Sequence, residues 1–416
     1  MRYSLLNLAW NALNANRLWK PLWRLPEPKP AYDVVIVGGG AHGLATAFYL
    51  AENHGIRNVA VVEKNYLGSG NAGRNTTIIR SNYSEAANIP FYDWSLKLWE
   101  QLEREVNYNV MVSQRGVMHL FHSDAQRDAH VYRGNRMRSF GVDCLLLDRA
   151  EVRRLAPYLD FENARFPILG ATFQPRGGTV RHDAVVWGYA GAADRHGVDL
   201  IQNCEVTGIR SRNGQVCGVD TTRGFIGASK LGIAVAGSSS RVAAMADLQL
   251  PIESHVLQAF VTEAVKPVTD HVIMFGAGHF YVSQSDKGGL VFGGNIDGYN
   301  SYAQRGNLPI IEETAEEAVS MMPMLGRLRV LRHWGGLVDM SMDGSPIIDR
   351  TPIGGLYINC GWCYGGFKAA PASGWCFAHT IANDEAHQLV RPYRLDRFAT
   401  GHLIDEHGTG AQPNLH

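Results

Sequence analysis

The sequence has little of several features that would assign it quickly to a class of protein. Its 39 basic side chains equal its 39 acidic ones, so no excess of positive charge points to nucleic acid as a partner. No run of about 18 apolar residues occurs, so no membrane-spanning helix is expected. The six cysteines are scattered over 416 residues and no signal-peptide pattern is present, so a reduced, cytoplasmic setting is predicted.

One pair of cysteines, Cys360 and Cys363, has the C-x-x-C spacing of redox and zinc motifs. A redox dithiol would need a thioredoxin-like βαβ context, and zinc would need a second pair of ligands. Neither pattern is evident. We therefore predict no metal site and interpret these cysteines as structural or as lining a pocket.

Glycine, in contrast, is abundant, with 45 residues, and a glycine-rich motif directly follows the apolar run Tyr32–Val37. That run is typical of a buried parallel strand. In the motif Gly-Gly-Gly-Ala-His-Gly, Gly38 permits a tight turn, Gly40 lets a pyrophosphate approach the backbone, and Gly43 lets the next helix pack closely. A second apolar run ends in Glu63, about twenty residues later, where a carboxylate binds a ribose hydroxyl. The order predicts a dinucleotide site, with a glycine-rich turn in an unrelated α/β domain as the weaker alternative.

Strand-like and helix-like patterns alternate along the chain, and a second glycine-rich turn follows a late strand-like segment, at Gly361–Lys368. We predict an α/β fold in which a Rossmann-like domain is interrupted twice by a second, β-rich α+β domain. The predicted segments are an N-terminal arm (1–31), a discontinuous Rossmann-like domain (32–110, 170–250 and 330–395), the second domain (111–169 and 251–329) and a C-terminal tail (396–416).

The N-terminal arm contains Trp10, Trp19 and Trp23 among basic residues. An interfacial membrane helix and an amphipathic transit peptide are two interpretations of this composition. Because the arm lacks a long apolar face, we favour a third, in which it packs on this chain or on a partner.

Two loops connect the chain with a known family. An early loop ends in Ile78-Ile79-Arg80, and the late strand leads into Gly365-Gly366-Phe367-Lys368. These segments resemble the amine-oxidising flavoproteins that include D-amino-acid and sarcosine oxidases. Within that family, four longer segments are similar to the β subunits of heterotetrameric sarcosine oxidases, namely residues 73–83, 181–185, 201–208 and 401–408.

The resemblance implies non-covalent FAD in the Rossmann-like domain, a substrate-binding second domain, and an FMN covalently linked to His182. In that family the FAD oxidises a secondary amine such as sarcosine, which is demethylated to glycine, and electrons then pass to the FMN. Partner α, γ and δ subunits are implied as well, with NAD and tetrahydrofolate expected on a partner only. The implied cofactor-binding positions, besides His182, are Gly38, Gly40, Ala41, His42, Gly43, Glu63, Lys64, Asn71, Arg74, Thr76, Ile78, Val206, Gly237, Gly365, Gly366 and Lys368.

Oxidation of an N-methyl amino acid requires a cation that holds the carboxylate and a substrate amine that is neutral. Arg80 is the candidate clamp, because a guanidinium pairs with a carboxylate through two parallel hydrogen bonds. Lys368 matches the family's second cation, and an alternative is that it lies beside the FMN and stabilises the reduced flavin. For either residue a surface ion pair is the non-functional interpretation. We expect His182 to lie in a loop between Gly177-Gly178 and a helix. Its non-functional interpretation is that it caps a helix that starts at Asp183.

Three departures from related enzymes qualify the resemblance. Gly335-Gly336 stands where monomeric sarcosine oxidases attach FAD to a cysteine, which predicts removable FAD. The apolar segment Gly289–Phe292 stands where they place an oxygen-activating lysine, so this FAD is expected to pass its electrons on. Cys363 and Tyr364 alter the late glycine loop, which keeps N-methylglutamate dehydrogenase, or another N-methyl amino acid dehydrogenase, as the nearest alternative. Of other classes, a non-catalytic FAD scaffold or electron-transfer subunit is disfavoured by the two cations, and an NAD-linked dehydrogenase by the second glycine loop.

Overall fold

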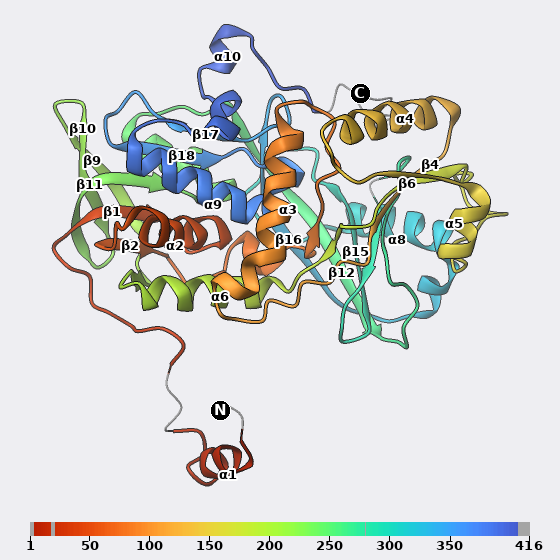
Figure 1. Ribbon diagram of the computed structural model, residues 1–416, viewed down its shortest axis with the longest axis horizontal. Coiled ribbons are helices and arrows are strands. Elements are labelled where there is room, and N and C mark those ends of the chain that lie inside the picture. Colours follow the sequence, from red (N-terminus) through yellow and green to blue (C-terminus); the bar gives the residue numbers. More distant parts are fainter. Residues whose placement is uncertain (1–3, 18–20, 279, 407–416) are drawn as a thin grey trace.

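The computed structural model describes residues 4–17, 21–278 and 280–406. The described residues form two regions, each built on an eight-stranded sheet (Figure 1). In the first region the main strand order is β17 (Ile347–Arg350), β18 (Leu356–Cys360), β11 (Gly224–Ile233), β1 (Ala31–Val37), β2 (Val59–Val62) and β8 (Asp199–Ile201). The strands from β18 to β8 run parallel. The antiparallel strands β10 (Gln215–Thr221) and β9 (Val206–Arg212) extend from β11.

The alternating side chains of β1 explain why this sheet is covered on both faces. Val34 and Ile36 pack into the core formed with the helices, whereas Val35 and Val37 pack into a separate core on the opposite face. A strand that is buried on both faces needs a continuous apolar run, which β1 and β2 have. The helices of the first region are α2 (Ala41–His54), α3 (Asn88–Glu105), α6 (His182–Arg195), α7 (Ser239–Ala243), α9 (Gly366–Asn383) and α10 (Arg397–Thr400).

The second region is built on a largely antiparallel sheet. Its strand order is β16 (Val330–Ser341), β12 (Ile252–Ala264), β15 (Gly289–Ile296), β14 (Tyr281–Gln284), β13 (Val272–Met274), β4 (Val117–Phe121), β6 (Gly170–Gln174) and β5 (Leu145–Asp148). Aromatic side chains such as Phe260, Phe280 and Phe292 form its core. Its helices are α4 (Asp124–Ser139), α5 (Arg149–Leu155) and α8 (Leu308–Met321).

Short elements complete the described chain. The strands β3 (Ile78–Ile79) and β7 (Gly178–Thr179) pair with each other. The 3-10 turns are η1 (Asn71–Arg74), η2 (Ala236–Ser238), η3 (Ala244–Ala246), η4 (Pro323–Arg327), η5 (Cys363–Gly365) and η6 (Gln388–Tyr393).

The architecture confirms the predicted fold class, a Rossmann-like α/β region interrupted by a β-rich region. Two strands nevertheless lie in a different sheet from the one that the predicted segments implied. β6 pairs with β4 and β5, and β16 pairs with β12, so both belong to the second sheet although they fall within 170–250 and 330–395. An apolar strand pattern shows that a strand is buried but not which sheet buries it. The segment boundaries themselves remain a prediction.

Two helices begin earlier than the sequence patterns indicated. α9 begins at Gly366 and contains Pro371 within its length, rather than starting near that proline. α6 begins at His182 itself, not at Asp183. His182 is therefore the first residue of a helix, and the prediction that it lies in a loop before one is wrong.

The N-terminal arm divides into two parts. Helix α1 (Leu5–Leu13) lies apart from both regions and buries none of its residues (Figure 1). Closer to β1, the arm packs on this chain, since Arg24 pairs with Asp194 at 2.8 Å and Lys29 with Asp199 at 2.9 Å. Trp19 lies outside the described residues. Within the described part of the chain, no helix combines the length and the apolar character that crossing a membrane requires.

Candidate active-site cavity

A cavity of about 750 Å³ lies where the carboxyl ends of β1 and β2 meet the second sheet. In open α/β sheets, ligands bind outside the carboxyl ends of the strands. Of the predicted site residues, all but Gly43 and His182 line this cavity. The cavity residues so assembled are Gly38, Gly40, Ala41, His42, Glu63, Lys64, Asn71, Arg74, Thr76, Ile78, Arg80, Val206, Gly237, Gly365, Gly366 and Lys368.

The structure gives a different physical reason for glycine at each of the three motif positions 38, 40 and 43. Gly38 has φ +111°, and a Cβ there would lie 2.4 Å from the Ala234 carbonyl oxygen. A Cβ on Gly43 would lie 2.0 Å from the Gly38 carbonyl oxygen, so Gly43 serves packing and does not line the cavity. Gly40 has an ordinary φ of −85° and nothing within 4 Å of its Cβ position. No contact within the described residues therefore requires glycine at position 40. An open space of this kind is expected where a ligand approaches the backbone.

Glu63 stands at the end of β2 with its carboxylate held in place. Its Oε2 accepts a hydrogen bond from the Gly39 amide at 2.9 Å, and its Oε1 accepts one from the Asn65 amide at 3.0 Å. The nearby helix α2 has Gly40 as its N-cap and no side-chain cap, so its first amides are available to an anion. A fixed carboxylate, a bare helix N-terminus and an open glycine together fit the ribose and pyrophosphate of a dinucleotide such as FAD.

His42 links the two helices that meet behind this end of the cavity. Its Nδ1 lies 2.6 Å from Ser373 Oγ, and its Nε2 lies 2.9 Å from the Gly366 carbonyl oxygen. Burial lowers the pKa of His42 to about 4, so the imidazole is neutral. These contacts make His42 a residue that joins α2 to the start of α9.

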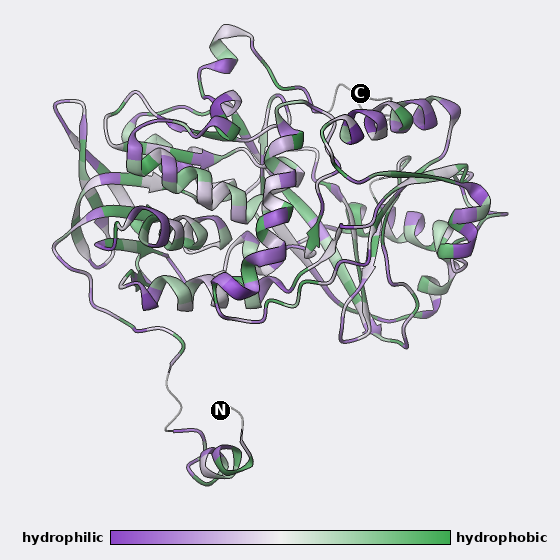
Figure 2. Cartoon of the chain, in the orientation of Figure 1, coloured by the Kyte–Doolittle hydropathy of each residue, from purple (hydrophilic) through white to green (hydrophobic). Residues whose placement is uncertain are grey.

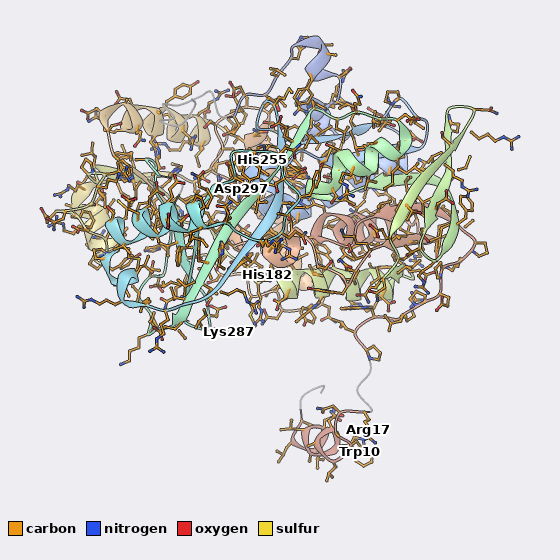
Figure 3. The ribbon with its side chains drawn as sticks, turned by 180° about the vertical axis from the view of Figure 1, so that it is seen from behind. Trp10, Arg17, His182, His255, Lys287 and Asp297 are labelled. Carbon is orange, nitrogen blue, oxygen red and sulfur yellow. The ribbon has the colours of Figure 1, made fainter. Side chains whose placement is uncertain are left out.

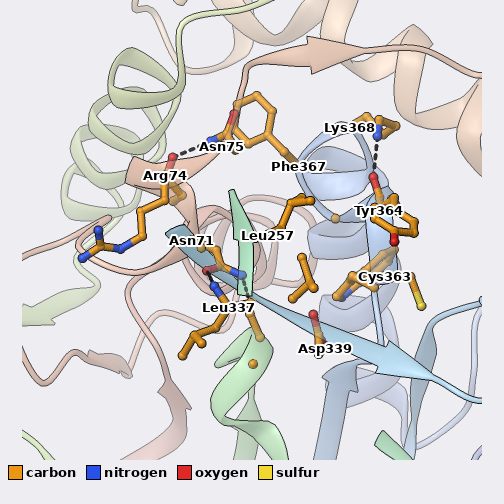
Figure 4. Close-up of a pocket in the computed structure, with 18 of the residues that line it drawn as sticks. Asn71, Arg74, Asn75, Leu257, Leu337, Asp339, Cys363, Tyr364, Phe367 and Lys368 are labelled. Atoms are coloured by element: carbon orange, nitrogen blue, oxygen red, sulfur yellow. Dashed lines mark hydrogen bonds between the residues drawn. The ribbon is translucent and has the colours of Figure 1, made fainter. Parts of the chain in front are cut away.

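The loop that contains η1 is fastened to β16. Asn71 donates to the Leu337 carbonyl oxygen and accepts from the Leu337 amide at 2.8 Å (Figure 4). Trp334 donates from its indole nitrogen to the Arg74 carbonyl oxygen at 2.7 Å. The Arg74 guanidinium bonds to Gln304 at 3.1 Å, while its buried Nε has no protein partner among the described residues. Strand β16, whose residues were expected in the first sheet, thus forms part of the cavity wall.

Arg80, the candidate clamp, has a guanidinium that is only partly engaged. Its Nη1 donates to Asn82 Oδ1 at 2.6 Å, and its Cζ lies 4.9 Å from the centre of the Tyr83 ring. Its buried Nε has no hydrogen-bond partner among the described residues. The contacts recorded for Arg80 include no carboxylate, so the fork is available to a carboxylate ligand.

Lys368 reaches the same cavity from the first turn of α9. Its Nζ donates to the Tyr364 carbonyl oxygen at 2.6 Å (Figure 4). Its own carbonyl oxygen accepts from Ser95 Oγ at 2.7 Å and from the Trp99 indole at 2.9 Å, which fixes the backbone. Burial and the charge of Arg80 hold the pKa of Lys368 well below its usual value.

One face of α4 also lines the cavity, and the sequence patterns did not indicate it. Its members recur at helical spacing and are Gln126, Ala129, His130 and Arg133. His119 on β4 lies beside them, with its ring centre 4.7 Å from that of His130. Burial lowers the pKa of His130 to about 3 and that of His119 well below its usual value, so both are neutral. Helix α4 is largely hydrophilic (Figure 2). The residues of its cavity face are mostly polar, so no apolar stripe in the sequence marks that face as buried.

Two carboxylates that were not predicted also reach the cavity, the half-buried Glu406 and the buried Asp339. Glu406 accepts from the Ser84 amide at 2.6 Å and from the Glu85 amide at 3.0 Å. Asp339 accepts from the Gly361 amide at 2.6 Å, and burial raises its pKa to about 6. Both carboxylates are bonded to backbone amides of loops that form the wall.

The altered glycine loop does face the cavity. Cys363 and Tyr364 both line it (Figure 4). Cys363 has φ +49°, a conformation in which a residue other than glycine is uncommon. Burial raises the pKa of its thiol to about 12, so it is neutral, and all six cysteines are free. No cluster of potential metal ligands occurs in the described residues.

His182 lies outside the cavity, at the N-terminus of α6 (Figure 3). Its side chain is half-buried, and its Nδ1 has no hydrogen-bond partner among the described residues. Burial lowers the pKa of His182. The residues on either side pair with each other, since Arg181 Nε and Nη2 donate to the two Asp183 oxygens at 2.6 and 2.8 Å. A half-buried, neutral imidazole with an unbonded ring nitrogen fits covalent attachment of a group that lies outside the cavity.

Known proteins resemble this chain over nearly its whole length. A family model described as FAD dependent oxidoreductase (DAO) matches residues 33–380. The sarcosine oxidase subunit beta of Rhizobium meliloti (strain 1021) is 68% identical over 416 residues, which is 100% of each chain. The sarcosine oxidase subunit beta of Arthrobacter sp. is 53% identical over 94% of this chain and 96% of its own. Among solved structures, L-proline dehydrogenase from P. horikoshii is 28% identical, with a TM-score of 0.84 over 91% of this chain and 100% of its own.

Proposed function

Because the chain belongs to the DAO family of FAD-dependent oxidoreductases and, within it, to the sarcosine oxidase β subunits, we propose that it oxidatively demethylates sarcosine to glycine as the β subunit of a hetero-oligomeric sarcosine oxidase. One observation supports this most strongly. A single cavity joins an end that fits FAD to an end where Arg80 and Lys368 lie without an acidic partner among their recorded contacts. A small amino acid whose carboxylate neutralises that end fits the arrangement.

Each part of the cavity has a task in this reaction. FAD, when bound along Gly38–Gly43 and Glu63, supplies the hydride acceptor. Arg80 holds the substrate carboxylate through its fork, which leaves the N-methyl group as the part of the substrate free to point toward the flavin. The stacked rings of Tyr83 and Tyr92, 3.5 Å apart, exclude water from that end of the cavity.

The finer features of the assembly belong to the same proposal. A covalent FMN on His182 would supply a second electron carrier, and α, γ and δ partners would cover it. Because Lys368 lies in the cavity and His182 outside it, we assign Lys368 to the substrate and not to the FMN. A cytoplasmic location is proposed from the free cysteines.

The proposal is tested by mixing the purified complex with sarcosine in the absence of oxygen. Bleaching of the flavin absorbance, with formaldehyde and glycine as products, is expected. N-methylglutamate is the second substrate to compare, because Tyr364 lines the cavity and can bond a second carboxylate. A large preference in kcat/KM for N-methylglutamate would overturn the sarcosine assignment.

The two flavins are separated by a second measurement. Acid precipitation should release FAD and leave FMN on a tryptic peptide that contains His182. The His182→Ala chain should lose only the peptide-bound flavin and keep its FAD. An unmodified His182 peptide from fully active complex would refute the FMN assignment.

A further inference from the structure

We propose that Lys368 enters the reaction as a neutral amine and accepts the proton that the substrate ammonium must lose before oxidation, while Arg80 supplies the permanent positive charge that binds the substrate carboxylate. The inference rests on the proposed function and assigns a chemical role within that site. In this proposal Arg80 and Lys368 are not two equivalent cations that bind the substrate carboxylate together.

The geometry brings the basic groups of Lys368 and Arg80 into one cavity, and neither has a recorded bond to a carboxylate. Lys368 and Arg80 both line the cavity, and the recorded bonds of their charged ends go to the Tyr364 carbonyl oxygen and the Asn82 amide oxygen. Like charges that share a site of low dielectric constant cannot all be retained. Because a guanidinium keeps its proton in proteins, the lysine ammonium is the group that loses its proton and becomes neutral.

The other titratable groups on the elements around Lys368 are neutral or positive, so they add no negative charge that would stabilise an ammonium. From α2 comes His42, which is neutral, and from α3 comes Tyr92, whose pKa is raised well above its usual value by burial. Tyr83 follows β3 and has a raised pKa, and Cys363 and Tyr364 on η5 have pKa values of about 12. On α4 and β4, His130 and His119 are neutral and Arg133 is positive.

Glu406 is the carboxylate that faces this end of the cavity. It is held by the amides of Ser84 and Glu85, and its charge acts on Tyr83, Tyr393 and Arg133. The groups that act on Lys368 do not include it. Asp339, another carboxylate that lines this cavity, is not among them either.

The proton transfer balances without any further reagent. Sarcosine arrives as a zwitterion, and its carboxylate neutralises Arg80, which removes the repulsion that kept Lys368 neutral. The Lys368 nitrogen lone pair then forms an N–H bond as one N–H bond of the substrate ammonium breaks. This step is a proton transfer in which nothing is oxidised or reduced. The substrate nitrogen keeps the lone pair that hydride loss from its methyl group requires, and the new ammonium keeps its bond to the Tyr364 carbonyl oxygen.

The pH profile of flavin reduction separates this role from that of a simple cation. In stopped-flow experiments without oxygen, Lys368→Met should slow reduction about 100-fold or more at pH 7, the usual size of a lost acid–base contribution. The loss should shrink steadily toward pH 10, as a growing fraction of the substrate amine is neutral in solution. Lys368→Arg should bind sarcosine nearly normally yet show the same loss at pH 7. Full rescue by Lys368→Arg, or a defect equal at all pH values, would overturn the proposal.

A binding measurement tests the charge of Lys368 without turnover. Acetate carries the carboxylate but no ammonium, so its binding at pH 8 should draw up to one proton per site from solution. A pH-indicator dye in weakly buffered solution reports this uptake, and both Lys368→Met and Lys368→Arg should abolish it. Absence of uptake in the parent complex, with acetate bound, would overturn the inference. Uptake in a complex that does not oxidise sarcosine would instead contradict only the proposed substrate.

Discussion

The two ends of the cavity recognise their ligands by different means. At the glycine end, residues 38–63 supply backbone amides, a helix N-terminus and a carboxylate. At the cation end, the polar groups come from the loop after β3, from β4, α4 and α9, and from the C-terminal segment. Recognition by backbone is therefore encoded locally, whereas recognition by charge is assembled from segments that are distant in the sequence. Substitutions at the two ends should separate cofactor binding from substrate binding.

The largest expected effect is at the glycine end. Gly40→Ala places a methyl group where no atom of the described residues lies within 4 Å, so the free energy of unfolding of the apoprotein should stay unchanged. FAD affinity should fall by about 3–6 kcal/mol, because the pyrophosphate loses on the order of two charge-assisted hydrogen bonds to the backbone. Fluorescence titration with FAD and chemical denaturation measure the two quantities.

Gly43→Ala is the matched control for this prediction. Its methyl group would overlap the Gly38 carbonyl oxygen at 2.0 Å, so it should destabilise the apoprotein by about 1–3 kcal/mol or more, as overpacking does. If Gly40→Ala destabilised the apoprotein as much as Gly43→Ala, position 40 would be a packing position and the FAD assignment would lose its main support.

The next largest effect is expected where the C-terminal segment is anchored near the cation end. Arg397 donates to both oxygens of Asp343, at 2.7 and 2.8 Å, and the two side chains are 2% and 0% exposed. Asp343 also accepts from the Ile404 amide at 3.0 Å, two residues before Glu406. Arg397→Met leaves a buried carboxylate unpaired and should destabilise the fold by about 3–5 kcal/mol. Thermal unfolding measures this loss, and KM for sarcosine should rise in the protein that remains folded.

A neighbouring arginine offers the control. Arg394 pairs with Asp396 at the surface, where the two side chains are 60% and 48% exposed. Arg394→Met should change the free energy of unfolding by less than about 1 kcal/mol. Equal effects of the two substitutions would mean that the buried pair does not hold the C-terminal segment in place.

The glycine end of the cavity could be predicted from the sequence better than the cation end. The reason is again that the first is encoded locally and the second is assembled from distant segments. Gly38, Gly40 and Glu63 follow from local needs, since a tight turn, a close approach and a strand end each require a particular residue type. The inner face of α4 did not follow, because its residues are polar and share no apolar period. Glu406 did not follow either, since only the folded chain brings the C-terminal segment to the start of α3.

The resemblance to a known family identified functional residues that local patterns did not. It did not indicate where these residues lie relative to one another in the folded chain. It named Arg80, Lys368 and His182 together, yet two of these residues line the cavity and the third lies outside it. It also gave no sign that β16 would cross from the predicted first region into the second sheet. A motif identifies the chemistry that a residue can perform, and the strand pairing determines which other residues it meets.

The smallest of these effects, and the one most specific to the cation end, is expected from Arg80→Ala. The substitution removes a charge-assisted contact to the substrate carboxylate worth about 1.5–3 kcal/mol, so KM for sarcosine should rise roughly 10- to 150-fold. FAD content should stay near that of the parent protein, since the glycine end is untouched. Arg80→Lys keeps the charge but loses the fork, and it should recover only part of the affinity. Steady-state kinetics with the flavin content measured on the same sample provide both readouts. Because Arg80 also lowers the pKa of Lys368, acetate binding by Arg80→Ala should draw less than one proton per site. Unchanged KM would remove Arg80 from the site, and parallel loss of FAD and sarcosine binding would show that the two ends do not act separately.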